Sequence, residues 1–293
     1  MYHNAPPLKI KGYRNCTIKD STNNSFVYVA RKFNTNRDQV ILKYIPHDEQ
    51  AIEQIDFECN IQKSLHNNYV MPLHNFFDIP EGFRVLEMPV AFKSLHELDS
   101  LKNISQIYKI MYQLALGVEY LHSENVLHGD LKPKNAVLMN NDEENPLVHI
   151  IDFGFAKKFS NANKNNCFCR CNKATQGFSA PEIIKKEPHS FPADIWSLGA
   201  TYYYLITGKF IKRSFYGEQI EFLNYDSNFG GELLESGKKL INKMISDNPN
   251  ERPTAKMIVN CEFFKQALGN YLTKLQDNSN NLDIRNSSNL MQK

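Results

Sequence analysis

Two acids and an amide stand close together in the middle of the chain, in a pattern that could do chemistry. Residues 128–135 read HGDLKPKN and carry Asp130, Lys132 and Asn135, and Asp152 follows in a DFG triplet. Carboxylate and amide oxygens suit a hard cation such as Mg²⁺. A carboxylate can also accept a proton from a hydroxyl, and an ammonium group can balance charge that develops nearby. The segment therefore indicates polar, metal-assisted chemistry.

These residues resemble the signature motifs of the protein kinase family. Upstream of them, Lys43 ends a β-like run, and Glu58 lies on the helical segment that follows. Downstream, later motifs of the family match residues 180–182 (APE), 194–199 (DIWSLG) and 248–253 (NPNERP). Each short motif is weak alone, but the ordered set is specific. The chain is identified as a member of the family.

The resemblance implies transfer of the γ-phosphoryl group of ATP to Ser or Thr hydroxyls of other proteins, with Mg²⁺ or, as a substitute, Mn²⁺. Asp130 is then the base near the attacking hydroxyl, and Lys132 is the cation that reaches the γ-phosphate. Asn135 and Asp152 are the expected metal ligands. Thr175 matches the threonine of Ser/Thr kinases that contacts the catalytic Asp and Lys. The expected catalytic set is Asp130, Lys132, Asn135 and Thr175.

The nucleotide is expected to bind on the N-terminal side of this segment. The resemblance implies an ion pair between Lys43 and Glu58 that holds the lysine against the α- and β-phosphates. Val27 and Ile41 would form an apolar roof over the adenine, and Val137 would lie beneath it. Leu86 precedes an apparent hinge at Glu87 and Met88. The expected nucleotide-binding residues are Lys43, Glu58, Val27, Ile41, Leu86, Glu87, Met88 and Val137.

The hydrophobic pattern indicates the elements that must position these residues. Residues 10–90 alternate short β-like runs with turns, and one helical segment interrupts them over about 48–65. From residue 100 onwards, apolar residues recur at steps of three and four, which is typical of one face of a long helix capped by Asn103. A buried helix is expected over 193–207, with Gly208 as its end.

A strand-rich first part and a helix-rich second part predict an α+β fold. We expect a bilobal protein-kinase-like fold over residues 10–264, with a small β-rich N-lobe to about residue 87 and a larger, mainly helical C-lobe from about residue 89. Residues 1–9 are expected to be an N-terminal extension. Residues 265–293, rich in Asn and Ser, are expected to be a largely disordered tail, with a short packed helix over 267–275 as the alternative.

Composition narrows the expected partners and location. A net charge of +2 over 293 residues does not favour bulk binding of nucleic acid or of an anionic membrane. No apolar run is long enough to span a bilayer, and the N-terminus lacks a signal-peptide pattern. Six cysteines are too few for a disulfide scaffold of this length. The sequence predicts an intracellular protein, cytoplasmic or nuclear, with ATP and Ser/Thr-containing protein substrates as partners.

The chain departs from the family in the loop that covers the phosphates. The aligned stretch, residues 20–27, reads DSTNNSFV and has no glycine. Glycines let a backbone approach phosphate closely, and Asp20 would bring negative charge towards the nucleotide. Ile41 stands where the family usually has Ala and would narrow the adenine roof. We therefore expect weaker ATP binding than is typical of the family.

Gly129 stands where most family members have an Arg beside the catalytic acid. That arginine responds to a phosphate on the activation segment. We therefore expect phosphatase treatment of the active protein to leave its transfer rate largely unchanged, and loss of activity would contradict this. The segment itself carries Cys167, Cys169 and Cys171. A Zn²⁺ site lacks a fourth ligand, and a redox switch is an alternative, but an exposed loop without such a role is favoured.

The resemblance implies two structural contacts. Glu182 and Arg252 are expected to form a largely buried salt bridge, and loss of one partner would cost roughly 3–5 kcal/mol. His128 is expected to be structural and to pack in a stack with Phe153, Leu73 and Gln62. A polar Gln62 is unusual in a stack that is otherwise apolar.

Two functions stay open at this point. One is an active Ser/Thr protein kinase. The other is a pseudokinase that acts as a scaffold or allosteric binding module, which the missing glycines, Ile41 and Gln62 favour. The enzyme is the stronger interpretation because glycines tune nucleotide binding, whereas Asp130 and Asp152 are indispensable to transfer. A small-molecule kinase is less favoured because residues 152–182 resemble a peptide-binding platform.

Overall fold

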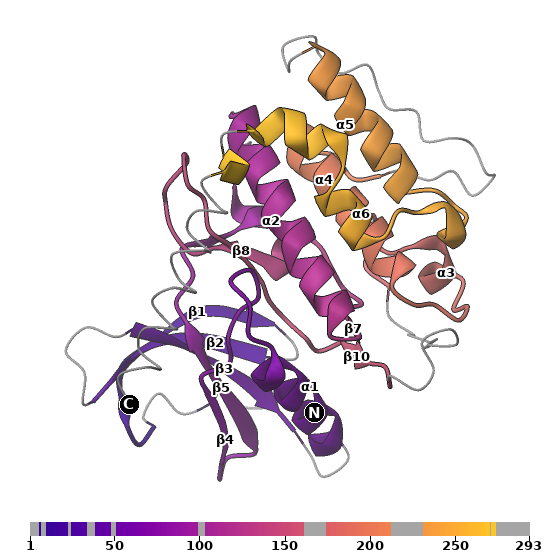
Figure 1. Cartoon of the computed structure of the whole chain (residues 1–293). Helices are drawn as coiled ribbons and strands as arrows, with labels where there is room; N and C mark the ends of the chain where they lie inside the picture. Colours follow the sequence, from indigo (N-terminus) through magenta and orange to yellow (C-terminus); the bar gives the residue numbers. More distant parts are fainter. Residues whose placement is uncertain are drawn as a thin grey trace, which may run out of the picture.

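The computed structural model describes residues 6, 10–22, 25–33, 39–47, 51–98, 103–160, 174–211, 231–269 and 271–273. A curled β-sheet with one helix beside it forms a small lobe, and a group of helices forms a larger lobe (Figure 1). This arrangement confirms the expected α+β, bilobal fold. Within the described residues, no helix is both long and apolar enough to cross a membrane.

The small lobe is a five-stranded antiparallel sheet in the order β1-β2-β3-β5-β4. Its strands are β1 (Tyr13–Thr22), β2 (Ser25–Lys32), β3 (Gln39–Pro46), β4 (Asn75–Ile79) and β5 (Phe83–Pro89). Side chains of β3 alternate between faces, so Val40, Leu42 and Tyr44 enter one apolar cluster. Helix α1 (Ile52–Ser64) packs by Ile55 and Cys59 against Leu86 of β5.

The large lobe is organised around two buried helices, α2 (Ile104–Ser123) and α4 (Pro192–Thr207). The Asn103 side chain accepts hydrogen bonds from the amides of Ser105 and Gln106, which confirms the expected cap of α2. Gly208 ends α4 with φ 67°, a left-handed conformation that glycine adopts without strain. The shorter helices among the described residues include α3 (Pro181–Ile184), α5 (Gly231–Met244) and α6 (Ala255–Val259).

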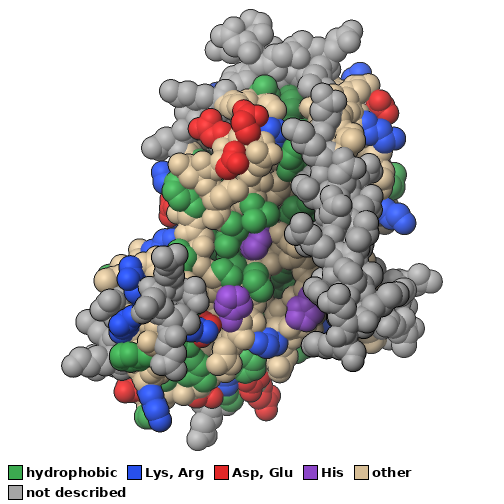
Figure 2. Space-filling model, turned by 60° about the vertical axis from the view of Figure 1, so that its left-hand side comes forward, with side chains coloured by type: hydrophobic (Ala, Val, Ile, Leu, Met, Phe, Trp, Pro, Cys, Tyr) green, Lys and Arg blue, Asp and Glu red, His purple; other side chains and the backbone are tan. Residues whose placement is uncertain are grey.

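Several of the residues expected to take part in catalysis or metal binding lie on or next to short strands and turns at the junction of the lobes. Strands β6 (Lys93–Ser94), β8 (Ala136–Leu138) and β9 (Val148–Ile150) form one small sheet, and β7 (Val126–Leu127) pairs with β10 (Lys157–Lys158). Single 3₁₀ turns are η1 (Leu95–Glu97), η2 (Pro133–Asn135) and η5 (Pro249–Glu251). On the face shown in Figure 2, the described Lys and Arg side chains are spread among acidic and apolar ones.

The first part of the segment expected to be a C-terminal tail packs on the large lobe, as in the alternative of a short packed helix. Residues 262–269 are helical, Leu268 is buried, and the hydroxyl of Tyr271 accepts a hydrogen bond of 2.6 Å from Gln113 of α2. Apolar anchors on this segment, which composition alone underweights, hold it against the large lobe. The structure therefore favours the packed helix as far as residue 273.

Candidate active site

Three of the four expected catalytic residues converge on the carboxylate of the fourth, Asp130. Lys132 Nζ donates to Asp130 Oδ2 at 2.6 Å, and Thr175 Oγ1 donates to Asp130 Oδ1 at 2.7 Å. Asn135 Nδ2 donates to Asp130 Oδ2 at 3.0 Å and to the Asp130 carbonyl at 2.9 Å. Lys132 Nζ also lies 3.2 Å from Thr175 Oγ1. The Asp130 carboxylate is thus held in a set orientation by three donors, one of which comes from a distant segment.

A buried acid anchors the loop that carries Asp130. Asp194, in the first turn of α4, accepts hydrogen bonds from the amides of His128 at 2.8 Å and Gly129 at 2.9 Å. His122 Nε2 lies 3.0 Å from the same carboxylate. Burial alone would raise the pKa of Asp194, but these bonds keep it below its ordinary value. Sequence reasoning did not assign this role, although a charged residue in a helix that is apolar nearly all round signals a buried partner.

The backbone conformation at position 129 favours glycine. Its φ is +79°, and a Cβ added there would lie 2.9 Å from the carbonyl oxygen of Phe155. A left-handed conformation costs a residue with a side chain roughly 1–2 kcal/mol. The absence of the family's usual arginine therefore relieves backbone strain next to Asp130.

Lys43 lies between the two expected acidic partners, but closer to one of them. Its Nζ is 2.9 Å from Asp152 Oδ1 and 3.8 Å from Glu58 Oε1. The nearby charge of Lys43 lowers the pKa of Asp152 to about 2. Burial disfavours the ammonium of Lys43, but the carboxylates of Asp152 and Glu58 outweigh this and raise its pKa. Burial raises the pKa of Glu58, whose link to Lys43 is the looser one.

Asn135 and Asp152 have the donor chemistry that Mg²⁺ needs. The backbone amide of Ile151 donates to the Asn135 carbonyl at 2.9 Å, which brings the two residues together. Asn135 uses its amide nitrogen as a donor, and Lys43 contacts only Oδ1 of Asp152. Among the residues that the structure describes, no three His, Cys, Asp or Glu side chains form a metal cluster. Two oxygen ligands with phosphate oxygens as the others fit the way Mg²⁺ is bound beside nucleotides.

The register of the strands shows on which face of the five-stranded sheet each expected nucleotide-binding residue lies. Residues paired directly across antiparallel strands lie on the same face. Val27 pairs with Lys43, and Lys43 pairs with Leu86. Ile41 pairs with Met88 and, two residues from Lys43, shares its face. Val137 is buried in β8, on the other side of the junction.

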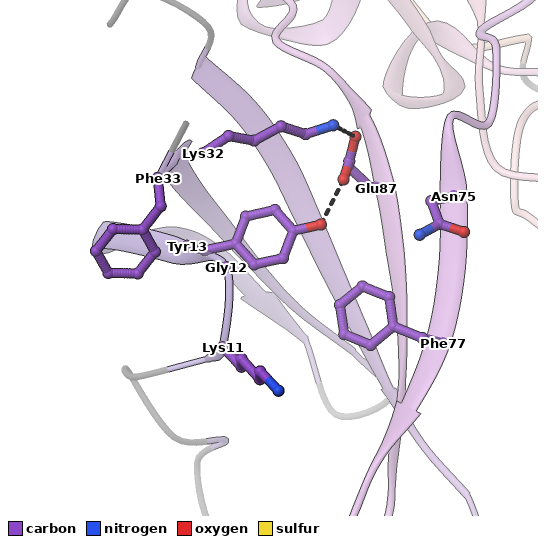
Figure 3. Close-up of a pocket in the computed structure, with 8 residues that line it drawn as sticks. All are labelled: Lys11, Gly12, Tyr13, Lys32, Phe33, Asn75, Phe77 and Glu87. Carbon is purple, nitrogen blue, oxygen red and sulfur yellow. Dashed lines mark hydrogen bonds and ion pairs between the residues drawn. The ribbon is translucent and has the colours of Figure 1, made fainter. Parts of the chain in front are cut away.

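Glu87 is an exception, because its side chain lies on the opposite face. It pairs with Leu42, and Figure 3 shows its carboxylate directed towards Tyr13 and Lys32 in a different hollow. Lys32 Nζ lies 2.6 Å from Glu87 Oε1, and the Tyr13 hydroxyl donates to Oε2. Burial raises the pKa of Glu87, but these two bonds lower it further than burial raises it. The Glu87 side chain is therefore turned away from the face that carries Lys43, and the expected place of Glu87 in the nucleotide hinge stays a prediction.

The expected stack around His128 is present in part. The ring centroids of His128 and Phe153 lie 5.3 Å apart at an interplanar angle of 61°. Gln62 is 2% exposed, and its amide donates to the Met71 carbonyl at 3.0 Å and contacts Met88 Sδ at 3.6 Å. The polar residue therefore has a backbone partner and does not leave an unsatisfied group in the core.

The described residues of the glycine-free stretch belong to the paired strands β1 and β2. Pairing of β1 with β2 continues to Thr22 and Ser25, and Asp20 Oδ1 accepts from the Ser21 amide at 2.8 Å. The exposed carboxylate of Asp20 thus stays in the arm expected to cover the phosphates. Cys167, Cys169 and Cys171 lie outside the described residues, so their expected roles stay predictions.

Replacement of Asp20 and Ser25 with Gly is expected to lower the KM for ATP by about two- to fivefold. A carboxylate a few ångströms from a phosphate costs on the order of 1 kcal/mol in water, and glycine allows closer approach. Initial-rate kinetics at varied ATP would measure the change. Asp20→Asn separates charge from backbone freedom, and an unchanged KM in both proteins would contradict the expectation.

Comparison with known proteins gives consistent matches. A family model for the protein kinase domain matches residues 23–264. The serine/threonine-protein kinase PLK1 of Xenopus tropicalis is 32% identical over 225 residues, which cover 75% of this chain and 36% of that protein. The probable serine/threonine-protein kinase CCRP1 of Zea mays is 30% identical over 240 residues, 78% of this chain and 37% of that protein. The chain thus aligns with little more than a third of the length of these relatives.

Proposed function

This chain belongs to the protein kinase family, and from that premise we propose that it transfers the γ-phosphoryl group of ATP to Ser or Thr hydroxyls of protein substrates. The observation that carries the proposal is the Asp130 carboxylate held by Lys132, Thr175 and Asn135. A carboxylate in that setting can orient a hydroxyl and accept its proton. A neighbouring ammonium balances charge that develops on the transferred group.

The second part of the proposal concerns the nucleotide. Lys43 would contact the α- and β-phosphates, and the apolar face with Val27, Ile41 and Leu86 would cover the base. Mg²⁺ bound by Asn135 and Asp152 would neutralise phosphate charge. With its pKa at about 2, Asp152 is ionised throughout the neutral range and is ready to serve as a ligand.

The pseudokinase alternative has less support. It rests on the missing glycines, on Ile41 and on Gln62. Gln62 is hydrogen-bonded rather than disruptive, and both acids and Lys43 are engaged with each other or with the other expected residues. We also propose that the kinase domain runs from about residue 10 to about residue 273, because the segment after 264 packs on the large lobe.

Transfer of labelled phosphate from Mg²⁺·ATP to a basic, histone-like protein would test the function. The expected result is incorporation that vanishes in Asp130→Asn, with label on Ser or Thr in phosphoamino-acid analysis. Label on Tyr would contradict the residue type. No incorporation, together with no thermal shift of the protein on addition of Mg²⁺·ATP, would favour the scaffold function.

A further inference from the structure

The interface between α1 and the sheet contains a buried cation that the proposed chemistry does not use. Arg84, in β5, is 4% exposed. Its Nε and Nη2 donate to the two carboxylate oxygens of Asp78 at 2.6 and 3.0 Å. Its Nη1 donates to Asp56 Oδ1, on α1, at 2.5 Å. The guanidinium carbon also lies 5.2 Å from the ring centroid of Phe76.

The two carboxylates have different structural roles. Asp78 and Arg84 pair directly across the β4–β5 hairpin, so their contact stays within that hairpin. Asp56 belongs to a different element, and its contact joins α1 to the sheet. Both aspartates are about half exposed, at 46% for Asp56 and 51% for Asp78. They therefore form a matched pair of carboxylates on Arg84, of which only the Asp56 contact crosses to α1, and Asp78 also lies 3.2 Å from His47 Nε2.

The position of α1 decides how Glu58 meets Lys43. Glu58 lies on the same turn of α1 as Asp56, and its Oε1 is 3.8 Å from Lys43 Nζ, near the limit of an ion pair. Within the described chain, that buried oxygen accepts no hydrogen bond. The start of α1 has no side-chain cap at Ala51. A small displacement of this half of the helix would therefore open or close the Glu58–Lys43 contact.

We propose that Arg84 and Asp56 are positioning residues, which tie α1 to β5 and thereby set the distance between Glu58 and Lys43. The tie acts on nucleotide binding through Lys43, not by contact with the nucleotide. The inference rests on the proposed kinase function, because it concerns the residues assigned to the phosphates. It predicts that the tie to Asp56 matters for ATP and the tie to Asp78 does not.

Steady-state kinetics of Asp56→Asn and Asp78→Asn would test the proposal. Each variant removes one negative charge next to Arg84, and Asp78→Asn disturbs the larger number of its hydrogen bonds. Asp56→Asn is expected to raise the KM for ATP about fivefold with a smaller change in kcat, since coupled residues interact by this order. Asp78→Asn is expected to keep the KM of the wild type. In a Glu58→Gln background, Asp56→Asn should have no further effect.

Equal KM changes in the two variants, or an undiminished effect in the Glu58→Gln background, would overturn the proposal. Amide hydrogen exchange of α1 gives a readout that does not need turnover. Amide hydrogens over Ile52–Ser64 are expected to exchange faster in Asp56→Asn than in Asp78→Asn. Equal exchange in the two variants would contradict the proposed tie between α1 and β5. A wild type with no transfer activity but with this exchange difference would count against the kinase function and not against the tie.

Discussion

Asp130→Asn is expected to lower kcat by about 10²–10⁴-fold, the usual contribution of a positioned general base, with little loss of stability. The amide can satisfy the same neighbours as the carboxylate. Its oxygen can accept from Lys132 and Asn135 in the place of Oδ2, and its nitrogen can donate to the Thr175 hydroxyl in the place of Oδ1. What the amide cannot do is accept a proton from the attacking hydroxyl.

The free energy of unfolding of Asp130→Asn and the kcat of a control variant, Thr175→Val, separate a loss of chemistry from a loss of folding. The free energy of unfolding is expected to change by less than about 1 kcal/mol, the size of one exchanged hydrogen bond. Thr175→Val, which removes one donor to Asp130 but keeps the acid, is expected to lose only about fivefold in kcat. An Asp130→Asn protein that folds normally and keeps more than about a tenth of the wild-type rate would show that Asp130 is not the base.

Arg252→Met is expected to lower the free energy of unfolding by about 3–5 kcal/mol, because it leaves Glu182 as an unpaired buried charge. The two residues form a bidentate pair, at 2.6 Å from Nη1 to Oε1 and 2.9 Å from Nη2 to Oε2, and each is 6% exposed. This confirms the expected buried salt bridge. Arg252 also donates to the carbonyls of Pro192 at 2.9 Å and Ser246 at 2.8 Å, so it joins three segments of the large lobe.

Urea unfolding would measure the loss, with a surface ion pair as the control. Lys238 donates to Glu235 at 2.7 Å, but the Glu235 side chain is 61% exposed. Glu235→Gln is therefore expected to cost less than about 1 kcal/mol. If Arg252→Met costs no more than this control, the buried pair does not stabilise the large lobe. Partial unfolding with an intact small lobe would appear as two transitions.

Much of the fold, and the proximity of most of the candidate catalytic residues, could be predicted because both rest on local patterns. The 3.6-residue period of α2, its Asn103 cap and the Gly208 end of α4 depend on side chains near in sequence. Asp130, Lys132 and Asn135 lie within one loop, so their types and spacing already imply proximity. The packing of residues 265–269 on the large lobe could not be predicted in this way, because composition cannot show which few apolar residues of a polar segment will be buried.

Other features depend on how distant segments meet. The face that Glu87 occupies follows from strand register, in which a shift of one residue exchanges the two faces. The role of Asp194 depends on two loop amides that are far from it in sequence. The type of Arg84 indicates only one more residue of a β-strand, and its contact with Asp56 joins two elements, β5 and α1, that only packing brings together.

The sequence by itself determined which groups can react and which local elements carry them, because residue identity and short-range periodicity are written along the chain. Only the tertiary structure decided the distances among those groups. It brought the Thr175 hydroxyl within hydrogen-bonding distance of Asp130, brought Lys43 nearer to Asp152 than to Glu58, and placed the Glu87 side chain on the face opposite Lys43. The physical reason is that these distances result from the packing of helices and strands against each other, and no single segment contains both ends of them.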